Sequence, residues 1–520
     1  GTLFGRNTSA GLIHVITAQP SFEEGGTAEL SYGNFDCWRA AVGLTGPISE
    51  KIAYRLDGVL VKRDGFVDEV LSGRSINDRD RWLVRGQLRL EPSDALSIRL
   101  IGDYADRDEE CCASVYLPTQ DVTRNADGSL SFGPSEMADL IRGLSGRADA
   151  VQDDTFARRT MLTPGRDYTS DVRDWGLSAE VNYDLGGAAL TSITAYRNWR
   201  YIRGQDSDYT VLDLLSREGD GGYTQTFKTF TQELRLQGEA FGGRLDWLVG
   251  GYFADEKLGL SDNLRFRGDY GRFFSCVTAS QLSAVPVSPA SPSCLNPALA
   301  AGLNSGLSPL GAFGPTVFNT LVRLQGINGD GAGIDRYRQD SRNWALFTHN
   351  RFDITDRLSL TLGLRYTSER KTLDAEFNGS AAAAGACLAN ARELSGILSS
   401  TAPQLAQARS LAQIIYSFSC LPVAPIARDA LRDRKSEDQF TGTAVLSFKA
   451  ADDLLAYASY SKGYKAGGYN LDRSPLGGVA SRGLPLSAGL LRFEPEKVDA
   501  FEVGAKYNGR GFDVNVAAFY

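Results

Sequence analysis

The residues that come nearest to a catalytic motif are Ser459 and Lys462, which match the Ser-x-x-Lys of penicillin-recognising enzymes. That chemistry needs a serine at the start of a helix, in a pocket with partner motifs that help to activate it. Here the motif lies in a run of strand character, without a credible Ser-Asp-Asn or Lys-Thr-Gly partner. His14 and His349 are the only histidines, so a Ser-His-Asp triad is poorly supported. The sequence predicts no catalytic residues and no enzyme.

The seven cysteines contain no Cys-x-x-Cys pair, so the sequence predicts no zinc site, and it indicates no other metal or cofactor. Six of them fall in three irregular segments, as the sequence neighbours Cys111 and Cys112, Cys276 and Cys294, and Cys387 and Cys420. Cys37 stands alone. The second and third pairs are interpreted as disulfides that close exposed loops in an oxidising compartment, each stabilising by about 3 kcal/mol. Connectivity does not follow from sequence, so pairing by proximity is a hypothesis.

Four arginines in the connection after the third predicted strand could meet an anionic ligand: Arg63, Arg74, Arg79 and Arg81. Three aspartates alternate with them, namely Asp64, Asp78 and Asp80. Opposite charges at this spacing favour a self-neutralised loop over a binding site. The sequence therefore leaves the ligand-binding residues unassigned.

The elements that must position these side chains alternate strictly between apolar and polar residues. Leu177–Leu185, Leu358–Tyr366 and Phe512–Val516 each place an apolar residue at every second position. Successive strand side chains point to opposite faces, so each segment has one apolar and one polar face. A soluble sandwich would turn the polar face outward, whereas a membrane barrel turns it to the lumen and presents the apolar face to lipid.

The lengths of the connections favour the barrel. Short turns fall near residues 46–49, 91–94, 186–187, 242–243, 355–356, 450–452 and 508–511. Long connections lie between them, at 108–172, 204–222, 261–338, 375–436 and 467–496. Short periplasmic turns and long extracellular loops produce this rhythm, and sandwiches or propellers have no reason to. Two strands for each short turn, and one before the first, predict about 15 antiparallel transmembrane strands.

Charged residues on the polar faces of these strands would line the lumen: Arg85, Arg89, Glu180, Glu233, Arg235 and Arg365. They would contact a solute or a plug, or pair with one another along a solvated wall. Tryptophans within or at the ends of strands predict aromatic girdles, with ordinary strand packing as the alternative: Trp38, Trp82, Trp175, Trp199, Trp247 and Trp344.

Two of the long loops contain apolar residues at helical spacing. They are Met137, Leu140, Ile141 and Leu144 in 134–150, and Leu394, Ile397 and Leu398 in 381–420. Short helices over the barrel mouth and partly mobile loops explain these patterns equally well.

Composition excludes other classes. A net charge of -8 argues against nucleic acid, which needs a basic face. No apolar run of about 18 residues is present, so no transmembrane helix is predicted. The chain opens on Gly1 without an initiator Met or signal peptide, and its last strand reaches Tyr520 without a closing strand. We therefore expect a barrel that is incomplete at both ends, and that would not close alone.

Several segments, taken together in chain order, resemble the TonB-dependent receptors of the bacterial outer membrane. Gly1–Thr17 resembles the end of that family's plug domain, although His14 stands where a small polar residue is common. Further matches are Gln232–Leu236, Thr355–Leu360, Gly363–Tyr366, Ser461–Asn470 and Phe493–Lys497. Each match is weak alone, and their order across nearly the whole chain carries the resemblance.

The resemblance implies a barrel of roughly 22 strands around a plug, of which about 15 strands lie here. Residues 1–20 would be the C-terminal remnant of the plug and residues 21–520 the barrel. The implied function is energised uptake of a scarce nutrient, most often a ferric siderophore. The implied partners are outer-membrane lipid, the small-molecule nutrient, and the inner-membrane TonB complex, which acts through plug parts absent from this sequence. A receptor for cobalamin or oligosaccharide, a passive channel, and a structural or adhesive barrel are the alternatives.

Overall fold

The computed structural model describes residues 13–117, 120–152, 154–166, 168–220, 222–281, 294–295, 297–305, 310–328, 334–421 and 425–520. Among these residues, one antiparallel sheet of 15 strands dominates. The strands in spatial order are β1 (Gly25–Gly33), β2 (Cys37–Ser49), β3 (Ile52–Arg63), β6 (Arg79–Ser93), β7 (Leu96–Glu110), β11 (Thr169–Asp184), β12 (Ala188–Arg203), β15 (Thr224–Ala240), β16 (Leu245–Asp262), β18 (Asp335–Thr355), β19 (Leu358–Asn378), β20 (Arg428–Ala451), β21 (Leu454–Lys465), β24 (Glu496–Asn508) and β25 (Asp513–Phe519). The predicted fold class and strand number are confirmed.

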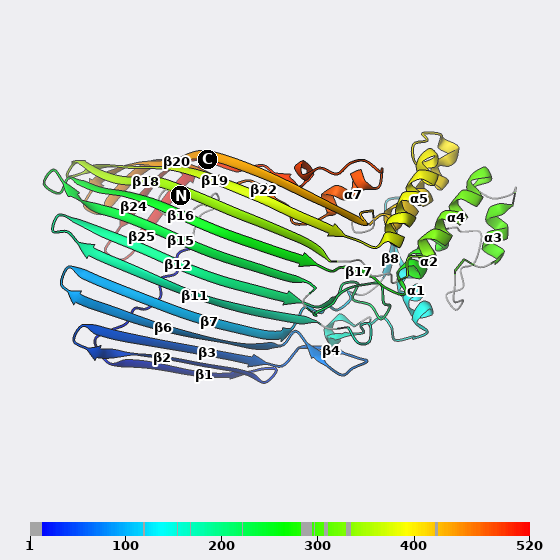
Figure 1. Cartoon of the computed structure of the whole chain (residues 1–520), viewed down its shortest axis with the longest axis horizontal. Coiled ribbons are helices and arrows are strands. Elements are labelled where there is room, and N and C mark those ends of the chain that lie inside the picture. The colour runs from blue at the N-terminus through cyan, green and yellow to red at the C-terminus, as the bar shows by residue number, and fades with distance from the viewer. Residues whose placement is uncertain are drawn as a thin grey trace.

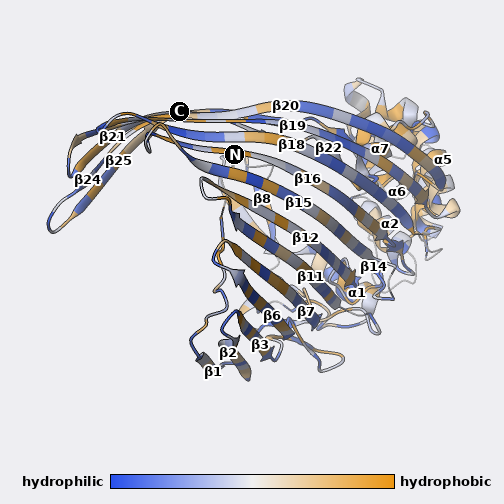
Figure 2. Ribbon diagram, turned by 60° about the vertical axis from the view of Figure 1, so that its left-hand side comes forward, coloured by the Kyte–Doolittle hydropathy of each residue, from blue (hydrophilic) through white to orange (hydrophobic). Residues whose placement is uncertain are grey.

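Within this sheet, each strand pairs antiparallel with the sheet strand that follows it in the sequence. The sheet curves into a trough, with β1 and β25 at its two edges (Figure 2). The predicted short turns gather at one end of the strands, and the long connections with their helices gather at the other (Figure 1). Figure 2 shows the alternation of hydropathy as stripes across the strands.

The outward face carries a belt of aromatic side chains that crosses the sheet from β1 to β24. Neighbouring rings in the belt have centroids 4.7 to 6.4 Å apart. The pairs are Tyr32–Trp38, Trp82–Tyr104, Trp175–Tyr196, Phe230–Phe253, Trp344–Tyr366, Tyr366–Phe440 and Tyr460–Phe501. Aromatic rings collect where hydrocarbon gives way to headgroups, so the belt marks one membrane interface.

Four tyrosines of this belt donate a hydrogen bond to an aspartate on the loop side of the ring. The pairs are Tyr32–Asp36 at 2.6 Å, Tyr104–Asp106 at 3.4 Å, Tyr366–Asp438 at 3.1 Å and Tyr460–Asp499 at 2.6 Å. Carboxylates avoid hydrocarbon, so the side of the belt towards the long loops is the aqueous side. Trp199 is not part of the belt, since it lies beside Tyr201 on the polar face at 6.0 Å between centroids. Trp247 lies near the short turns.

The long connections fold into a cap of helices and very short strands. The helices are α1 (Glu136–Ser145), α2 (Tyr270–Ser280), α3 (Pro297–Asn304), α4 (Gly314–Gln325), α5 (Ala381–Leu398), α6 (Ala406–Ser419) and α7 (Ser474–Ala480). The strands are β4 (Val67–Glu69), β5 (Ser75–Ile76), β8 (Gln120–Arg124), β9 (Leu130–Pro134), β10 (Arg159–Thr160), β13 (Gln205–Asp206), β14 (Leu215–Arg217), β17 (Arg265–Phe266), β22 (Gly468–Tyr469) and β23 (Arg492–Phe493). Single 3-10 turns span Thr155–Ala157, Gly311–Phe313, Pro403–Leu405 and Ala488–Leu491. No helix among the described residues is both long and apolar enough to cross a membrane.

The cap has apolar cores of its own, which explains why the loops are ordered. The largest core joins residues of α1, α2, α4, α5 and α6. Of the two alternatives for residues 134–150 the structure has the helix, and α1 buries Leu140, Ile141 and Leu144, whereas Met137 is 43% exposed. The disulfides Cys276–Cys294 and Cys387–Cys420 form as proximity predicted, and Cys111–Cys112 forms a third. Cys37 is free.

Candidate functional site

The polar face of the sheet is a wall of paired charges. On β6, β7, β11 and β12, two arginines alternate with two aspartates. Arg197 contacts Asp103 at 2.9 Å and Asp174 at 2.8 Å, and Arg85 lies 3.8 Å from Asp103. Each guanidinium thus has a carboxylate, and this group of four is neutral. It fits the interpretation of a mutually paired lumenal wall.

The other predicted lumenal charges mostly follow this pattern. Arg89 pairs with Glu91, and Glu233 pairs with Arg235. Glu180 accepts a hydrogen bond from Asn182 at 3.0 Å. Arg365 differs, because its guanidinium lies 5.5 Å from the ring centre of Tyr252 and 5.3 Å from that of Phe347. Aromatic faces, rather than a carboxylate, therefore contact this almost fully buried charge.

The segment from Ile13 to Glu24 contains no helix or strand and is held against the lumenal wall. Gln87 donates to the carbonyl of Ala18 at 3.2 Å, and Arg99 donates to the hydroxyl of Thr17 at 3.1 Å. The backbone N–H of Ser21 donates to the hydroxyl of Thr45 at 2.8 Å. Residues 1–12, which carry most of the plug-like sequence, lie outside the described residues. The described contacts tie the rest of that segment to β2, β6 and β7.

A hollow of about 1460 Å³ opens at the short-turn end of this wall. Its charged lining residues are mostly acidic and include Glu50, Glu91, Asp94, Asp184, Glu239 and Asp246, with Lys51 and Arg351 opposing them. His349 also lines it. The polar interior therefore continues to the end of the strands that faces away from the cap.

The catalytic motif considered first is excluded by its geometry. Ser459 and Lys462 both lie in β21, where Ser459 pairs with Val445 and Lys462 pairs with Gly442. Residues three apart in a strand point to opposite faces. The lysine therefore cannot reach the serine, and the pair has no nucleophile–base geometry. Within the described residues, no three histidine, cysteine or acidic side chains are arranged to hold a metal ion.

The arginines after the third strand find partners, though not the predicted ones. Arg79 and Arg81 bind Glu109, and Arg74 binds Glu110 at 2.9 Å. Arg63 donates to the carbonyl of Asn77 at 2.6 Å. The neutralising carboxylates thus come from the end of β7. Asp78 accepts the backbone N–H of Glu110 at 2.7 Å, and Asp80 pairs with Lys62 at 3.2 Å.

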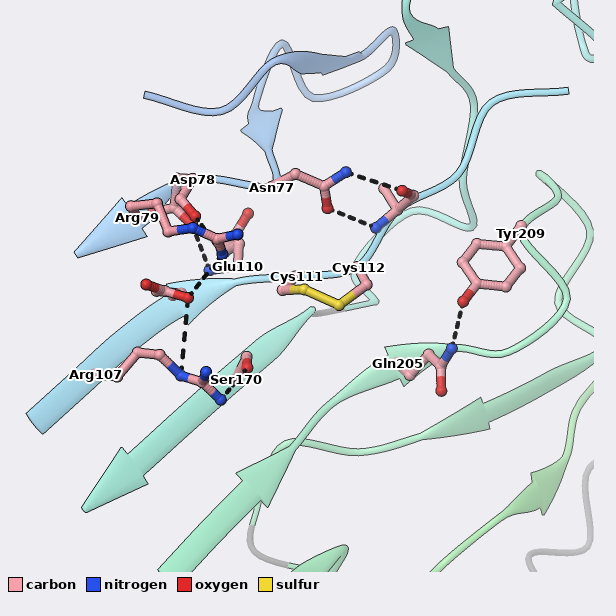
Figure 3. Close-up of a disulfide and its surroundings, with 12 residues drawn as sticks. Asn77, Asp78, Arg79, Arg107, Glu110, Cys111, Cys112, Ser170, Gln205 and Tyr209 are labelled. Atoms are coloured by element: carbon pink, nitrogen blue, oxygen red, sulfur yellow. Dashed lines mark hydrogen bonds and ion pairs between the residues drawn. A yellow bond between two sulfur atoms is a disulfide. The ribbon is translucent and has the colours of Figure 1, made fainter. Parts of the chain in front are cut away.

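Arg107 and Glu109 complete this group, and sequence reasoning missed both. Glu109 is buried and is reached by three guanidiniums: Arg81 donates at 2.7 and 2.8 Å, Arg79 donates at 3.2 Å, and Arg107 lies at 3.8 Å. Figure 3 shows Arg79 and Arg107 on either side of the end of β7, next to the Cys111–Cys112 disulfide. The strand alternation could have identified them, because Arg107 and Glu109 are separated from Arg99 by even numbers of residues and therefore lie on the same polar face of β7.

The disulfide lies in a segment that is fixed on both sides. The N–H of Cys111 donates to the carbonyl of Tyr168 at 2.8 Å. One residue further along, Asn77 both donates to and accepts from the backbone of Ala113, at 2.9 Å in each direction (Figure 3). These contacts fix the chain as it leaves the arginine group for the cap.

Two carboxylates, of buried Asp206 and partly buried Asp208, tie neighbouring loops together in the cap. Asp206 accepts the N–H of Thr163 at 3.0 Å, and Asp208 accepts the N–H of Leu215 at 2.8 Å. Burial first, and the charge of Asp208 second, together raise the pKa of Asp206 to about 8. Burial also raises the pKa of Asp208. One of the two therefore keeps a proton in neutral solution.

The loop after β21 is attached to the wall by two lysines. Lys371 donates to the carbonyl of Gly467 at 2.5 Å. Lys435 donates to the carbonyl of Phe493 at 3.1 Å and pairs with Glu437 at 2.9 Å. These residues lie within or against the Ser461–Asn470 and Phe493–Lys497 segments, so one physical role of those motifs is to hold this loop over the lumen.

A lipid-facing apolar surface, an aromatic belt, a polar lumenal wall and a loop cap define the wall of an outer-membrane β-barrel. The sequence profile described as "TonB dependent receptor-like, beta-barrel" matches residues 116–520, well over half of the chain. The chain belongs to the TonB-dependent receptor family. It is therefore an outer-membrane protein, in a family of receptors rather than enzymes.

Solved structures share the fold at low sequence identity. The ferric yersiniabactin uptake receptor FyuA from Yersinia pestis matches with a TM-score of 0.61 and 15% identity, over 100% of this chain and 57% of that receptor. The ferric-catecholate import receptor Fiu from E. coli K12 matches with 0.56 and 14%, over 100% and 61%. The siderophore receptor PiuA from Acinetobacter baumannii matches with 0.55 and 13%, over 99% and 59%. This chain thus spans less than two thirds of each receptor's length.

Proposed function

We propose that the protein imports a ferric siderophore across the outer membrane, with energy delivered by the TonB complex of the inner membrane. The observation that carries the proposal is the hold of the lumenal wall on the segment before β1, through Gln87 and Arg99. A channel that is open by default has no use for a segment bound across its wall. A receptor that must stay closed until it is energised needs such a segment to block its lumen.

The same proposal assigns residues 1–20 to a plug domain and residues 21–520 to the barrel. The contacts of Thr17 and Ala18 with the wall support a segment that lies inside the barrel rather than within its sheet. The polar lumen, the ordered cap and the siderophore receptors among the structural relatives support a nutrient ligand. Cobalamin and oligosaccharide receptors are the alternatives within the same class, and a passive channel is the alternative outside it.

Iron-limited growth of a strain that lacks the gene tests the proposal. The strain is supplied with one ferric chelate at a time, and uptake of radioactive iron is measured with and without a protonophore. We expect the deletion to abolish uptake of at least one chelate, and the protonophore to abolish it in the parent. Unchanged uptake of every chelate would redirect the search to cobalamin and oligosaccharides. Uptake that survives the protonophore would indicate a passive channel.

A further inference from the structure

Three guanidiniums share one carboxylate on the lumenal wall, near the cap. Glu109 is buried, and Arg79, Arg81 and Arg107 surround it while each stays about one third exposed, at 38%, 37% and 33% of the side chain. The carboxylate is thus saturated, and the cations still face the lumen. We call these four residues the arginine triad and its glutamate.

The register of the sheet makes the triad unfavourable without a partner. Arg81 and Arg107 are direct cross-strand neighbours in the β6–β7 pairing. Like charges in this relation repel and destabilise a sheet. Glu109 offsets part of the repulsion, because Arg81 binds both of its oxygens. Arg107 gains little from it, since its Nε has no hydrogen-bond partner and its Nη2 reaches only Ser170 at 3.4 Å.

The excess of positive charge persists when the surrounding residues are counted. Six arginines (Arg63, Arg74, Arg79, Arg81, Arg107 and Arg203) face three carboxylates (Asp78, Glu109 and Glu110), which leaves three positive charges. Arg203 follows Glu109 and Ser170 along one row of the sheet, and it makes no ion pair with any described residue. The group of Arg85, Asp103, Arg197 and Asp174 on the same strands is neutral by contrast.

Aromatic rings lie next to the surplus charge. The guanidinium of Arg107 is 6.0 Å from the ring centre of Tyr201. Trp199 and Tyr223 lie 6.0 and 6.3 Å from that ring, centroid to centroid. Guanidiniums bind planar oxyanions through paired N–H groups, and aromatic side chains bind flat rings by stacking. Together they suit an anionic ligand with aryl oxygens.

We propose that the arginine triad binds the negative charge of the imported chelate, with Tyr201 against an aryl group, so that the receptor selects anionic aryl-oxygen chelates of iron over neutral ones. The inference rests on the proposed function. It names a specificity site within it, at residues of β6, β7 and β12. Arg107 carries the selection most directly, because Glu109 engages it least.

The test measures affinity by quenching of tryptophan fluorescence in the intact receptor, purified in detergent. The probes are a ferric tris-catecholate, which is anionic, ferric citrate, which is anionic without aryl groups, and a neutral ferric tris-hydroxamate. The variant is Arg107→Gln, which leaves Glu109 bound by Arg79 and Arg81. The matched control is Arg85→Gln, on the same face of β6, since Asp103 keeps Arg197.

We expect wild type to prefer the tris-catecholate, and Arg107→Gln to lower its affinity roughly tenfold or more, the usual effect of losing a charge-assisted contact. Affinity should also fall with added salt in wild type, and less so in the variant. Arg85→Gln should change neither the affinity for the tris-catecholate nor its dependence on salt. If Arg107→Gln lowers the affinity for all three probes equally, or for none of them, the inference is overturned. The proposed function still stands in that case, provided that wild type binds a ferric chelate. Wild type that binds no ferric chelate would overturn both.

Discussion

Arg473 and Asp335 form an ion pair that joins the loop after β21 to the start of β18. Nε of Arg473 donates to Oδ2 at 2.6 Å, and Nη2 donates to Oδ1. Their side chains are only 5% and 8% exposed. The remaining nitrogen, Nη1, donates to the carbonyl of Ile426 at 3.1 Å, and the guanidinium lies 5.7 Å from the ring centre of Phe377. One arginine thus joins the loop after β21 to the loop-side ends of β18 and β19 and to the segment before β20.

Arg473→Met should loosen this part of the cap. Removing one partner of a buried ion pair leaves an uncompensated charge, which destabilises by about 3–5 kcal/mol. Burial already raises the pKa of Asp335 in spite of its arginine. Hydrogen exchange of residues 467–492, followed by mass spectrometry, should therefore accelerate, while exchange in the transmembrane strands stays unchanged.

The control is the double variant Arg473→Met with Asp335→Leu. An apolar pair of similar size removes both charges and fits the surrounding core of Leu476, Leu491 and Phe377. The double variant should recover most of the protection lost in the single one. If it is as unprotected as the single variant, the ion pair acts through its geometry and not through the cost of an unpaired carboxylate.

Two of the disulfides should differ sharply in how much they stabilise the cap. Cys387–Cys420 bridges a separation of 33 residues, whereas Cys111–Cys112 joins adjacent residues. Cross-linking restricts the unfolded chain in proportion to the logarithm of the loop, so the first should stabilise the cap by about 3–4 kcal/mol. The Cys387→Ser, Cys420→Ser double variant should therefore raise hydrogen exchange in α5 and α6. The Cys111→Ser, Cys112→Ser double variant should leave both helices protected, and equal loss in the two would contradict the loop-entropy account.

The Asp206–Asp208 pair predicts a cap that loosens as pH rises. The pKa of Asp206 is raised from its ordinary 3.8 to about 8 in the folded protein, by burial first and by Asp208 second. A raised pKa means that the proton stabilises the folded loop. This contribution is complete below about pH 4, declines as pH rises, and is lost through pH 8.

Limited proteolysis of residues 204–217 at several pH values measures this effect. Cleavage relative to a peptide standard should increase between pH 5 and 8, by up to roughly tenfold for each pH unit, and level off above it. Asp206→Asn keeps an uncharged acceptor for the N–H of Thr163 and should flatten the profile. A profile as steep in Asp206→Asn as in wild type would assign the pH dependence to another group.

Particular residues show why the sheet could be predicted from the sequence. Alternation with a period of two identifies a strand and both of its faces, so Leu358–Tyr366 revealed the outward leucines of β19 without a structure. The pairs Cys276–Cys294 and Cys387–Cys420 could be predicted because the two cysteines of each pair lie in one irregular segment. Strands of two or three residues, such as β13 and β14, have no period to detect and were not predicted.

The arginine triad could not be predicted, for two physical reasons. The sequence predicts a connection that begins at residue 108 and so places Glu109 in a loop, whereas β7 continues to Glu110. In addition, the cross-strand neighbour of Arg81 depends on the register of β6 against β7. The turn between the two strands sets this register, and the pairing is irregular between Leu90 and Ser93. The sequence therefore favours the adjacent Asp64, Asp78 and Asp80 as neutralising partners, where the structure has Glu109.

The assignment of faces predicts a strong difference between adjacent positions of β19. Leu362 lies on the outward face and is 48% exposed, whereas Thr361 lines the hollow on the lumenal face. Leu362→Lys should destabilise the folded barrel by roughly 2–4 kcal/mol, because its ammonium must enter hydrocarbon. Thr361→Lys keeps its ammonium in water and should change stability by less than about 1 kcal/mol. Denaturant titration of the receptor in lipid vesicles, followed by tryptophan fluorescence, measures both, and equal losses would mean that one of the two faces has been assigned wrongly.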